Sequence, residues 1–433
     1  MKTMKWERKP LGSLADRCLG KMLDQNKNRG EPFPYLANVN VRWGEFELSD
    51  LRTMRFESKE MDRYGLKFGN IVMCEGGEPG RCAIWKGQLP GMMIQKAIHR
   101  IRPNELLDYR FLFYSFLHLG HSKVFDQYFT GATIKYLTGE KLAKVEVDIP
   151  PLPTQKRIAS ILSAYDELIE NSQRRIKILE AMARSLYREW FVHFRYPGHE
   201  NHPRVASALG EIPLGWAAKA LDDVCTRITD GSHLSPQSVE DGYPMASVKD
   251  MHDWGINVKG CRRISSVDYE NLVRNDCKPL TNDLLIAKDG SYLKHTFVVS
   301  EEQDLVILSS IAMLRPNDSI RPNYLCLALR NPVTKARMKG IVSGVAIPRI
   351  VLKDFRKFEI LVPPDDVQDA WTKIVDPMLA KCRKLVGQTE NLRRTRDLLL
   401  PRLLSGQIDI EAAQSILARI RDCTERVDPA GIA

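Results

Sequence analysis

The segment DIPPLPTQKRIASIL, Asp148–Leu162, joins a strand-like run to a helix-like run through a pair of prolines. Its pattern returns in LVPPDDVQDAWTKIV, Leu361–Val375. In both segments Pro-Pro is followed at the same spacing by a glutamine, Gln155 in the first and Gln368 in the second, 213 residues later. Because the chain has 433 residues, only about twice this period, the pattern indicates two copies of one unit.

The repeat extends along nearly the whole chain. FGNIVMCEGG, residues 68–77, aligns with TNDLLIAKDG, residues 281–290, at the same offset of 213. Nearer the N-terminus the offset becomes 210, as in the pairing of Trp6 with Trp216, and a short difference in loop length accounts for the change. Order and spacing persist although identical residues are few, so the duplication concerns a whole folded unit.

After each proline pair, a seven-residue recurrence predicts a long helix with a coiled-coil-like apolar seam. The first helix should run from Thr154 to about Phe191 and be roughly 57 Å long. The recurring positions are Ile158, Tyr165, Ser172, Leu179 and Leu186 in the first copy, and Trp371, Met378, Leu385, Leu392 and Leu399 in the second. Pro377 and Pro401 predict that the second helix is kinked or begins and ends within those limits. Ser405-Gly406 is a stop signal.

The first ~150 residues of each copy contain short runs rich in β-branched residues between Gly, Pro, Asn and Asp clusters, which predict strands and turns. Residues 109–119 and 324–332 are matched helical segments. Because the second helix must return along the first, the expected fold class is α+β. Two tandem mixed α/β modules are separated by a pair of long antiparallel helices, in a pseudo-twofold arrangement.

The composition is that of a soluble globular protein, with 43% hydrophobic and 27% charged residues. No apolar run approaches the ~18 residues of a membrane span, and the charged N-terminus is unlike a secretory signal. Nine scattered cysteines without a C-x-x-C pair favour a reducing cytoplasm. The net charge of +10 suggests a polyanionic partner, although solubility alone also explains it.

Four stretches resemble the DNA specificity subunit of type I restriction–modification systems. They are IPPLPTQKRIASILSAYDELIE, RSLYREWFVHFRYPG followed by GEIPLGWAAKALDDVC, ITDGSHLSPQSVEDGYPMASVKDM, and LLLPRLLSGQIDI. The resemblance covers roughly residues 5 to 410. It departs from the family at LPTQ, where LxEQ is commoner, and at PDDVQ, and it leaves the final AAQSILARIRDCTERVDPAGIA outside the pattern.

The resemblance implies a division of the chain. Residues 1–150 and 201–363 would be target recognition domains, 151–200 and 364–410 spacer helices, the former with a central linker, and 411–433 a tail. Each recognition domain would read one half of a split double-stranded DNA target, and the helices would set the gap between the halves. The subunit would be catalytically silent and without a cofactor, and would hold two methyltransferase subunits together with restriction subunits that move and cut DNA.

Enzyme signatures do not match the sequence. Adenine methyltransferases place Asp or Asn before Pro-Pro and an aromatic residue after it, whereas Ile149 and Val362 precede the prolines here and Leu152 and Asp365 follow them. EGGEPG, 75–80, is typical of a turn and not of a cofactor loop. The alternative from another class is a non-enzymatic scaffold whose modules bind proteins.

Two weaker enzyme patterns also favour ordinary surface positions. Asp50 with Glu57-Ser58-Lys59 fits a nuclease metal motif only loosely. In HENH, residues 199–202, the histidines have the wrong spacing to share a helical face as zinc ligands. The sequence therefore predicts binding, with no catalytic residue and no metal site.

Base edges are usually read by Arg, Lys, Asn and Gln, and phosphates attract cations. The resemblance places reading loops around ANVNV and ASVKDM and before the last strand of each module. The residues predicted to contact DNA are Asn38, Asn40, Thr133 and Lys135 in the first module and His233, Lys249, Asp250 and Arg349 in the second, with Lys288 and Lys294 at phosphates. For each of them, a solvated surface position is the alternative.

Overall fold

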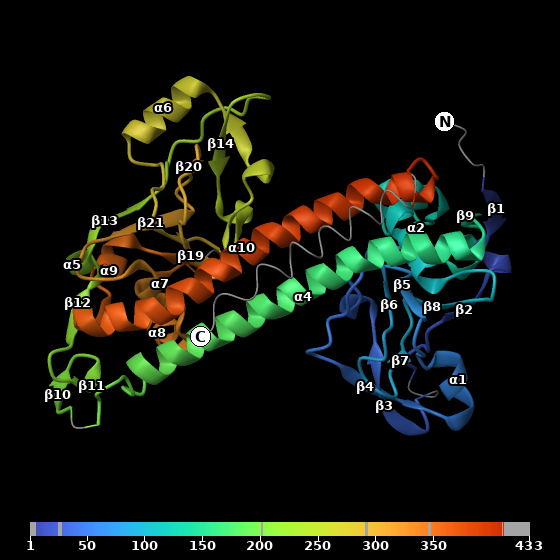
Figure 1. The fold of residues 1–433 in the computed structure, drawn as a ribbon, viewed down its shortest axis with the longest axis horizontal. Coiled ribbons are helices and arrows are strands. Elements are labelled where there is room, and N and C mark those ends of the chain that lie inside the picture. The colour runs from blue at the N-terminus through green and yellow to red at the C-terminus, as the bar shows by residue number, and fades with distance from the viewer. Residues whose placement is uncertain are drawn as a thin grey trace. The chain divides into compact units, whose positions relative to one another are not determined.

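The computed structural model of the protein describes residues 6–24, 28–200, 202–290, 293–344, 348–408 and 410 (Figure 1). The C-terminal tail expected at 411–433 lies outside the described residues. The chain divides into two compact units. The first unit is Met1–Asn171 with Thr389–Ala433, and the second is Ser172–Gln388.

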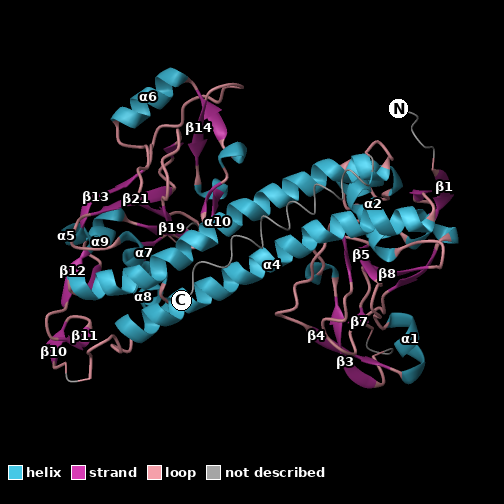
Figure 2. Ribbon diagram, viewed as in Figure 1, coloured by secondary structure: helices cyan, strands magenta, loops and turns pink. Residues whose placement is uncertain are grey.

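The first unit contains many short strands, drawn in magenta in Figure 2. They form a four-stranded antiparallel sheet in the order β2-β8-β5-β6, a three-stranded sheet in the order β4-β3-β7, and the pair β1-β9. These strands are β1 (Glu7–Pro10), β2 (Ala15–Leu19), β3 (Glu31–Leu36), β4 (Arg52–Phe56), β5 (Ile71–Cys74), β6 (Cys82–Ile84), β7 (Met93–Ile94), β8 (Ile98–Pro103) and β9 (Glu146–Ile149).

The second unit repeats all three arrangements as β13-β21-β18-β19, β17-β14-β20 and β12-β24, with the same strand directions. These strands are β12 (Ala217–Ala220), β13 (Cys225–Asp230), β14 (Tyr243–Ala246), β17 (Arg262–Ile264), β18 (Leu284–Ala287), β19 (Thr296–Val298), β20 (Val306–Ile307), β21 (Ile311–Pro316) and β24 (Glu359–Val362). The duplication seen in the sequence is therefore a duplication of topology.

Shorter elements complete the units. They are α1 (Met61–Tyr64), α3 (Gly139–Ala143), β10 (Arg204–Ser207), β11 (Gly210–Pro213), α5 (Leu221–Val224), β15 (Met251–His252), β16 (Gly255–Ile256), α6 (Ser266–Arg274), α8 (Pro332–Met338), β22 (Val342–Ser343), β23 (Arg349–Ile350) and α9 (Leu352–Arg356).

The two matched helical segments form α2 (Tyr109–His121) and α7 (Pro322–Arg330), as predicted. Asp108 caps α2, because its Oδ1 accepts from the backbone N–H groups of Arg110 and Phe111 at 3.0 and 3.1 Å. Both helices bury apolar side chains against their own four-stranded sheet, so each unit has a core of its own.

Two long helices, α4 (Leu152–Phe191) and α10 (Asp365–Leu404), contain 40 residues each, which confirms the prediction of long helices. In the first unit the beginning of α4 packs against the end of α10, with Ile158 and Tyr165 in one core with Leu392 and Leu400. The beginning of each helix lies beside the end of the other, since in the second unit the end of α4 packs in turn against the beginning of α10. There the ring of Phe191 lies 5.5 Å from that of Trp371.

The expectation that the second long helix begins and ends between Pro377 and Pro401 is wrong, because α10 continues through both prolines. A proline inside a helix removes one hydrogen bond and costs roughly 3 kcal/mol. Trp371, Val375 and Leu379 bury their side chains on either side of Pro377, and burial of large apolar side chains offsets a cost of this size. The helix ends at Leu404, and Gly406 follows with a positive φ of 70°, as the stop signal predicts.

The tryptophans at equivalent positions contact the ends of the long helices. In the second unit the ring of Trp216 lies 5.9 Å from that of Phe191, the last residue of α4. In the first unit Trp6 Nε1 donates a hydrogen bond of 3.0 Å to the carbonyl of Leu404, the last residue of α10. Each helix therefore ends against the segment that begins a strand pair, β12-β24 or β1-β9.

The repeated glutamines explain why the proline motif occurs twice. Gln155 is fully buried; its Oε1 accepts from Asp108 N at 2.9 Å, and its Nε2 donates to the carbonyls of Leu106 and Pro150 at 3.0 and 2.9 Å. The glutamine thus joins three chain segments, namely the strand exit at the prolines, the start of α4 and the loop before α2.

Gln368 makes the same three contacts in the second unit. Its Oε1 accepts from Arg321 N at 3.0 Å, and its Nε2 donates to the carbonyls of Ser319 and Pro363 at 3.1 and 2.9 Å. Since an apolar side chain could not satisfy these buried backbone groups, the position requires an amide.

Replacing either glutamine, as Gln155→Ala or Gln368→Ala, should lower the free energy of unfolding by about 1–3 kcal/mol, the cost of leaving buried polar groups unsatisfied. Denaturant titration of the full chain measures the effect. Gln237→Ala, at an exposed position, is the matched control. Equal losses in the free energy of unfolding for all three substitutions would contradict the role of the buried amides in holding the three chain segments together.

Candidate nucleic-acid interface

The turns after β3 and β14 are stabilised by equivalent buried side chains. Asn40 Oδ1 accepts from Ala37 N at 3.0 Å, and Asp250 Oδ2 accepts from Ser247 N at 2.8 Å. Asn40 Nδ2 also donates to the Glu47 carbonyl at 3.1 Å, and Asp250 Oδ2 also accepts from Ser247 Oγ at 2.9 Å. Each residue is only 7% exposed.

Both side chains are thus used to shape their turns, and the contact of Asn40 and Asp250 with DNA stays a prediction. The residues just before them, Val39 and Lys249, are exposed. In the second unit the turn therefore presents a cation to the solvent, whereas the first unit presents an apolar side chain at the same place.

In the first unit, Asn38 lies beside the loop that follows β5. Its Nδ2 donates to the Gly76 carbonyl at 3.3 Å, and it remains partly exposed. A hairpin on the other side of this loop is closed by Thr130 and Tyr136, whose backbones exchange hydrogen bonds of 2.8 Å. A Cβ on Gly76 would lie 3.0 Å from the Tyr136 ring. Asn38 and the hairpin are therefore neighbours across one loop.

Thr133 and Lys135 occupy the exposed tip of this hairpin. Lys135 Nζ lies 4.0 Å from Asp126 Oδ2 and 5.9 Å from the Phe129 ring. Exposed pairs of this kind contribute less than about 1 kcal/mol, so Lys135 can exchange its carboxylate for another anion.

The buried His99 contacts the chain directly after the same hairpin. Its Nε2 lies 2.9 Å from the Leu137 carbonyl, and Leu137 N donates to the Glu75 carbonyl at 2.8 Å. Burial lowers the pKa of His99, and the hydrogen bond to the Leu137 carbonyl opposes this shift only in part. The neutral ring therefore donates to the carbonyl and holds the loop after β5 against the hairpin.

In the second unit, Asp230 joins two of the predicted contact residues. Its Oδ1 lies 3.2 Å from His233 Nε2, and its Oδ2 lies 3.2 Å from Lys288 Nζ, which is also 3.3 Å from Asp289 Oδ1. His233 has a side chain that is 76% exposed, but Lys288 is buried between the two carboxylates. The charge of Lys288 is thus compensated inside the unit, and its contact with a phosphate stays a prediction.

Arg349 and the turn that carries Lys249 meet at the same loop. Ile350 N donates to the Lys288 carbonyl at 3.1 Å, and both Val248 N and Lys288 N bond to Ser310, at 3.1 and 2.9 Å. Arg349 and Lys249 are exposed. Lys294 is exposed as well, in the loop between β18 and β19. The fold therefore gathers the exposed predicted residues of the second unit around one set of loops.

Two glycines fix the framework under these loops. A Cβ on Gly20 would lie 2.3 Å from the Gln95 carbonyl oxygen, and one on Gly231 would lie 2.0 Å from the Ile307 carbonyl oxygen. Neither position admits a side chain, and both lie at the ends of equivalent strands. Sequence reasoning missed them; their signal was a glycine directly after the equivalent strand in each copy.

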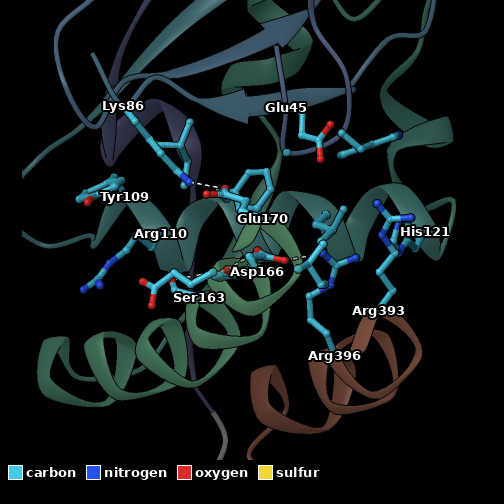
Figure 3. A pocket seen from close by; sticks show the side chains of 18 of the residues that line it. Glu45, Lys86, Tyr109, Arg110, His121, Ser163, Asp166, Glu170, Arg393 and Arg396 are labelled. Carbon is cyan, nitrogen blue, oxygen red and sulfur yellow. Dashed lines mark hydrogen bonds and ion pairs between the residues drawn. The ribbon is translucent and has the colours of Figure 1, made fainter. Parts of the chain in front are cut away.

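A cavity of 470 Å³ in the first unit lies between α2, the beginning of α4 and the end of α10 (Figure 3). Asp166 is the centre of its polar contacts, because Tyr114 Oη and Arg396 Nη1 both donate to it at 2.5 Å. Burial and the Asp166 charge raise the pKa of Tyr114 well above its ordinary value, so the phenol remains a donor. In Figure 3, Lys86 and Glu170 form a second pair, at 2.5 Å.

The charges of Asp166 and Arg396 compensate one another, as do those of Lys86 and Glu170. Among the described residues, no group of three or more His, Cys, Asp or Glu could hold a metal ion. None of the helices in the described part of the chain is long and apolar enough to cross a membrane.

A family model of the type I restriction modification DNA specificity domain matches the chain twice, over residues 4–181 and 213–392. The chain belongs to this family. The matched ranges correspond to the two copies found in the sequence, and each includes the strands and loops described above. The family thus agrees with the predicted resemblance and with the α+β fold class.

Relatives cover most of the chain. The MjaIX specificity subunit of Methanocaldococcus jannaschii is 26% identical over 349 residues, which are 79% of this chain and 78% of the relative. The HindI specificity subunit of Haemophilus influenzae is 22% identical over 473 aligned positions, covering 93% of this chain and 99% of the relative. Both are type I restriction enzyme specificity subunits, which supports DNA recognition over the protein-interaction scaffold.

The fold is shared with a solved structure. The type I restriction-modification S subunit from M. genitalium is similar with a TM-score of 0.58 at 18% identity, and the match covers 93% of this chain and 97% of that one. The strand order and the long helices of this family are therefore kept where few residues are identical.

Acidification should destabilise the wild-type first unit through His99. Its pKa is lower in the folded than in the unfolded protein, so below about pH 6.5 the unfolded state binds more protons and stability falls with pH. His99→Gln keeps a donor but cannot be protonated. The substitution should flatten the decline measured by denaturation between neutral and mildly acidic pH, whereas His202→Gln, at an exposed site, should not. An unchanged pH profile in His99→Gln would contradict the assignment.

The cavity contacts lead to a second prediction, because the second unit has Leu379 and Ala183 where the first has Asp166 and Arg396, each 213 residues apart. Arg396→Ala alone should cost about 1.5–3 kcal/mol, since it leaves a partly buried carboxylate without its cation. In a Tyr114→Phe background, where no buried hydroxyl loses its acceptor, the double variant Asp166→Leu/Arg396→Ala should recover most of this loss. A double-mutant cycle of unfolding free energies measures the coupling, and strictly additive effects would contradict it.

Proposed function

We propose that this chain is the DNA-recognition subunit of a type I restriction–modification complex, with residues 1–150 reading one half of a split target and residues 201–363 reading the other. The observation that carries this proposal is the repeated framework with differing exposed residues. The two units share strand order and loop geometry, yet Val39 and Lys249 occupy the same turn position in the two copies. Equivalent scaffolds with different side chains suit the reading of two different half-sites.

The residues proposed to face DNA are the exposed members of the predicted set. They are Asn38, Thr133 and Lys135 in the first unit, and His233, Lys249, Lys294 and Arg349 in the second. Amide and guanidinium groups form paired hydrogen bonds with base edges in the major groove, and lysines neutralise phosphates. Asn40, Asp250 and Lys288 contribute indirectly by holding the loops.

The partners follow from the same proposal. The two long helices, within 151–200 and 364–410, are proposed to space the recognition domains and to hold two methyltransferase subunits, with restriction subunits completing the complex. The chain itself contributes no catalytic group. The names of the related specificity subunits support this division of labour.

Reconstitution tests the proposal. The purified chain should bind DNA weakly and transfer no methyl group, and adding its methyltransferase subunit should bring methylation of adenines in a split sequence. Sequencing of methylated DNA identifies both halves of the site. Robust methylation or cleavage by the isolated chain would overturn the proposal.

Substitution in the second unit tests the assignment of half-sites. Lys249→Ala and Arg349→Ala should weaken discrimination in one half of the target by about 1–3 kcal/mol per lost base contact and leave the other half unchanged. Competition binding of the reconstituted complex, with single base changes across the site, measures this. Arg274→Ala, which removes an exposed cation on α6, is the control, and loss of discrimination in both halves would contradict separate reading.

A further inference from the structure

A basic cavity of 550 Å³ lies at the end of β2 in the first unit. Its lining includes five cations, Lys21, Arg29, Lys59, Arg63 and Lys96, but only two carboxylates. Sequence reasoning missed it, because these cations are far apart in the chain and follow no common motif. Only the fold brings them together.

The floor of the cavity is a buried ammonium group. Lys21 is only 3% exposed; its Nζ donates to the Arg55 carbonyl at 2.9 Å and pairs with Glu60 Oε2 at 2.6 Å. Burial alone would raise the pKa of Glu60, but hydrogen bonds from Lys21 and from the Glu57 backbone lower it below its ordinary value. Glu60 is thus an anion hydrogen-bonded to Lys21, and it attracts Lys59 and Arg63 without forming an ion pair with either.

The rim of the cavity carries the free charge. The second carboxylate, Glu57, lies 3.1 Å from Lys59 Nζ in an exposed pair. In the part of the chain that the structure describes, Arg29, Arg63 and Lys96 form no ion pair, and all three are exposed. Three cations around one hollow repel each other, so an anion bound between them would be stabilised.

The cavity adjoins the proposed reading loops. Lys96 N donates to the Lys21 carbonyl at 2.8 Å, and the flanking Gln95 N donates to the Leu36 carbonyl, just before the Asn38 turn, at 3.0 Å. Glu75 N donates to the Ala97 carbonyl at 2.8 Å. The turn between β7 and β8, which carries Lys96, therefore contacts both the segment before the Asn38 turn and the loop after β5.

The second unit has serines at the positions of Lys21 and Lys96. There Ser309 N donates to the Ser232 carbonyl at 3.0 Å, in the same place as the bond from Lys96 to Lys21. The bridges Lys21–Gln95 and Ser232–Leu308 are equivalent as well. This backbone bond therefore forms with serines as well as with lysines, so it does not require the charged side chain of Lys96.

We infer that this cavity binds phosphates of the DNA backbone next to the half-site read by the first unit. The inference rests on the proposed function and adds to it the residues that position the duplex, namely Arg29, Arg63 and Lys96. These cations contact no base, so they contribute affinity and register but no sequence preference. The second unit would position its DNA through Lys294 and its other exposed cations instead.

The test uses the complex assembled with its methyltransferase subunits and measures DNA affinity over a range of salt concentrations. The triple variant Arg29→Gln/Arg63→Gln/Lys96→Gln should reduce the slope of log K against log salt by about 2–3, since each lost phosphate contact removes roughly 0.9. Binding should weaken equally for specific and unrelated DNA, and the methylated sequence should stay the same. Lys96→Gln alone should reduce the slope by about 1.

The matched control removes the same charge elsewhere. Lys144→Gln/Arg204→Gln/Arg274→Gln neutralises three exposed cations outside the cavity. A slope that falls equally in both triple variants, or in neither, would overturn the inference. Both triple variants leave Lys21 in place, and unchanged denaturation midpoints show that they fold. The single variant decides the outcome if the triple variant is destabilised. Failure of the wild-type complex to methylate a split site would instead count against the proposed function.

Discussion

A buried glutamine amide at the start of each long helix is the interaction on which the rest of each unit depends. In one residue it joins the strand exit at Pro-Pro, the first turn of the helix and the loop that begins α2 or α7. Because α2 and α7 pack on the four-stranded sheets, this amide couples each sheet to its long helix. A recognition surface on loops can be placed accurately only when the scaffold beneath it is fixed. Pro-Pro and Gln recur in the sequence because both units use the same buried hydrogen bonds to connect a strand, a long helix and a loop.

The sequence alone predicted the duplication, the two long helices and the α+β class, because each leaves a periodic signal. It failed where tertiary packing decides. Pro377 interrupts a helical pattern, but the buried residues around it keep the helix intact. Asn40 and Asp250 are residue types that read bases, and tertiary packing buries both in the hydrogen bonds of their turns, which the sequence does not reveal. The basic cavity has no sequence signal, since its cations converge only after three separate segments have folded.

The two units differ most where the polar cavity contacts replace apolar packing. Asp166, Tyr114 and Arg396 form a charged cluster in the first unit, whereas Leu379 and Ala183 are buried at the corresponding positions in the second. Arg396, near the end of α10, is partly buried and needs the carboxylate of Asp166 to compensate its charge. The end of α10 therefore matches the first unit and the end of α4 the second, so the copies are no longer interchangeable although their backbones remain alike.

The contact between Trp6 and Leu404 has a consequence for the order of the chain. In the second unit a covalent connection, residues 192–215, leads from the end of α4 to Trp216, whereas in the first unit a hydrogen bond joins the end of α10 to Trp6. The end of each long helix is therefore connected to the tryptophan of the same unit, by the peptide chain in the second unit and by a hydrogen bond in the first. Moving the chain ends from one of these connections to the other gives a circular permutant with the same neighbours throughout. The contacts between helix ends and tryptophans therefore do not depend on which unit comes first along the chain.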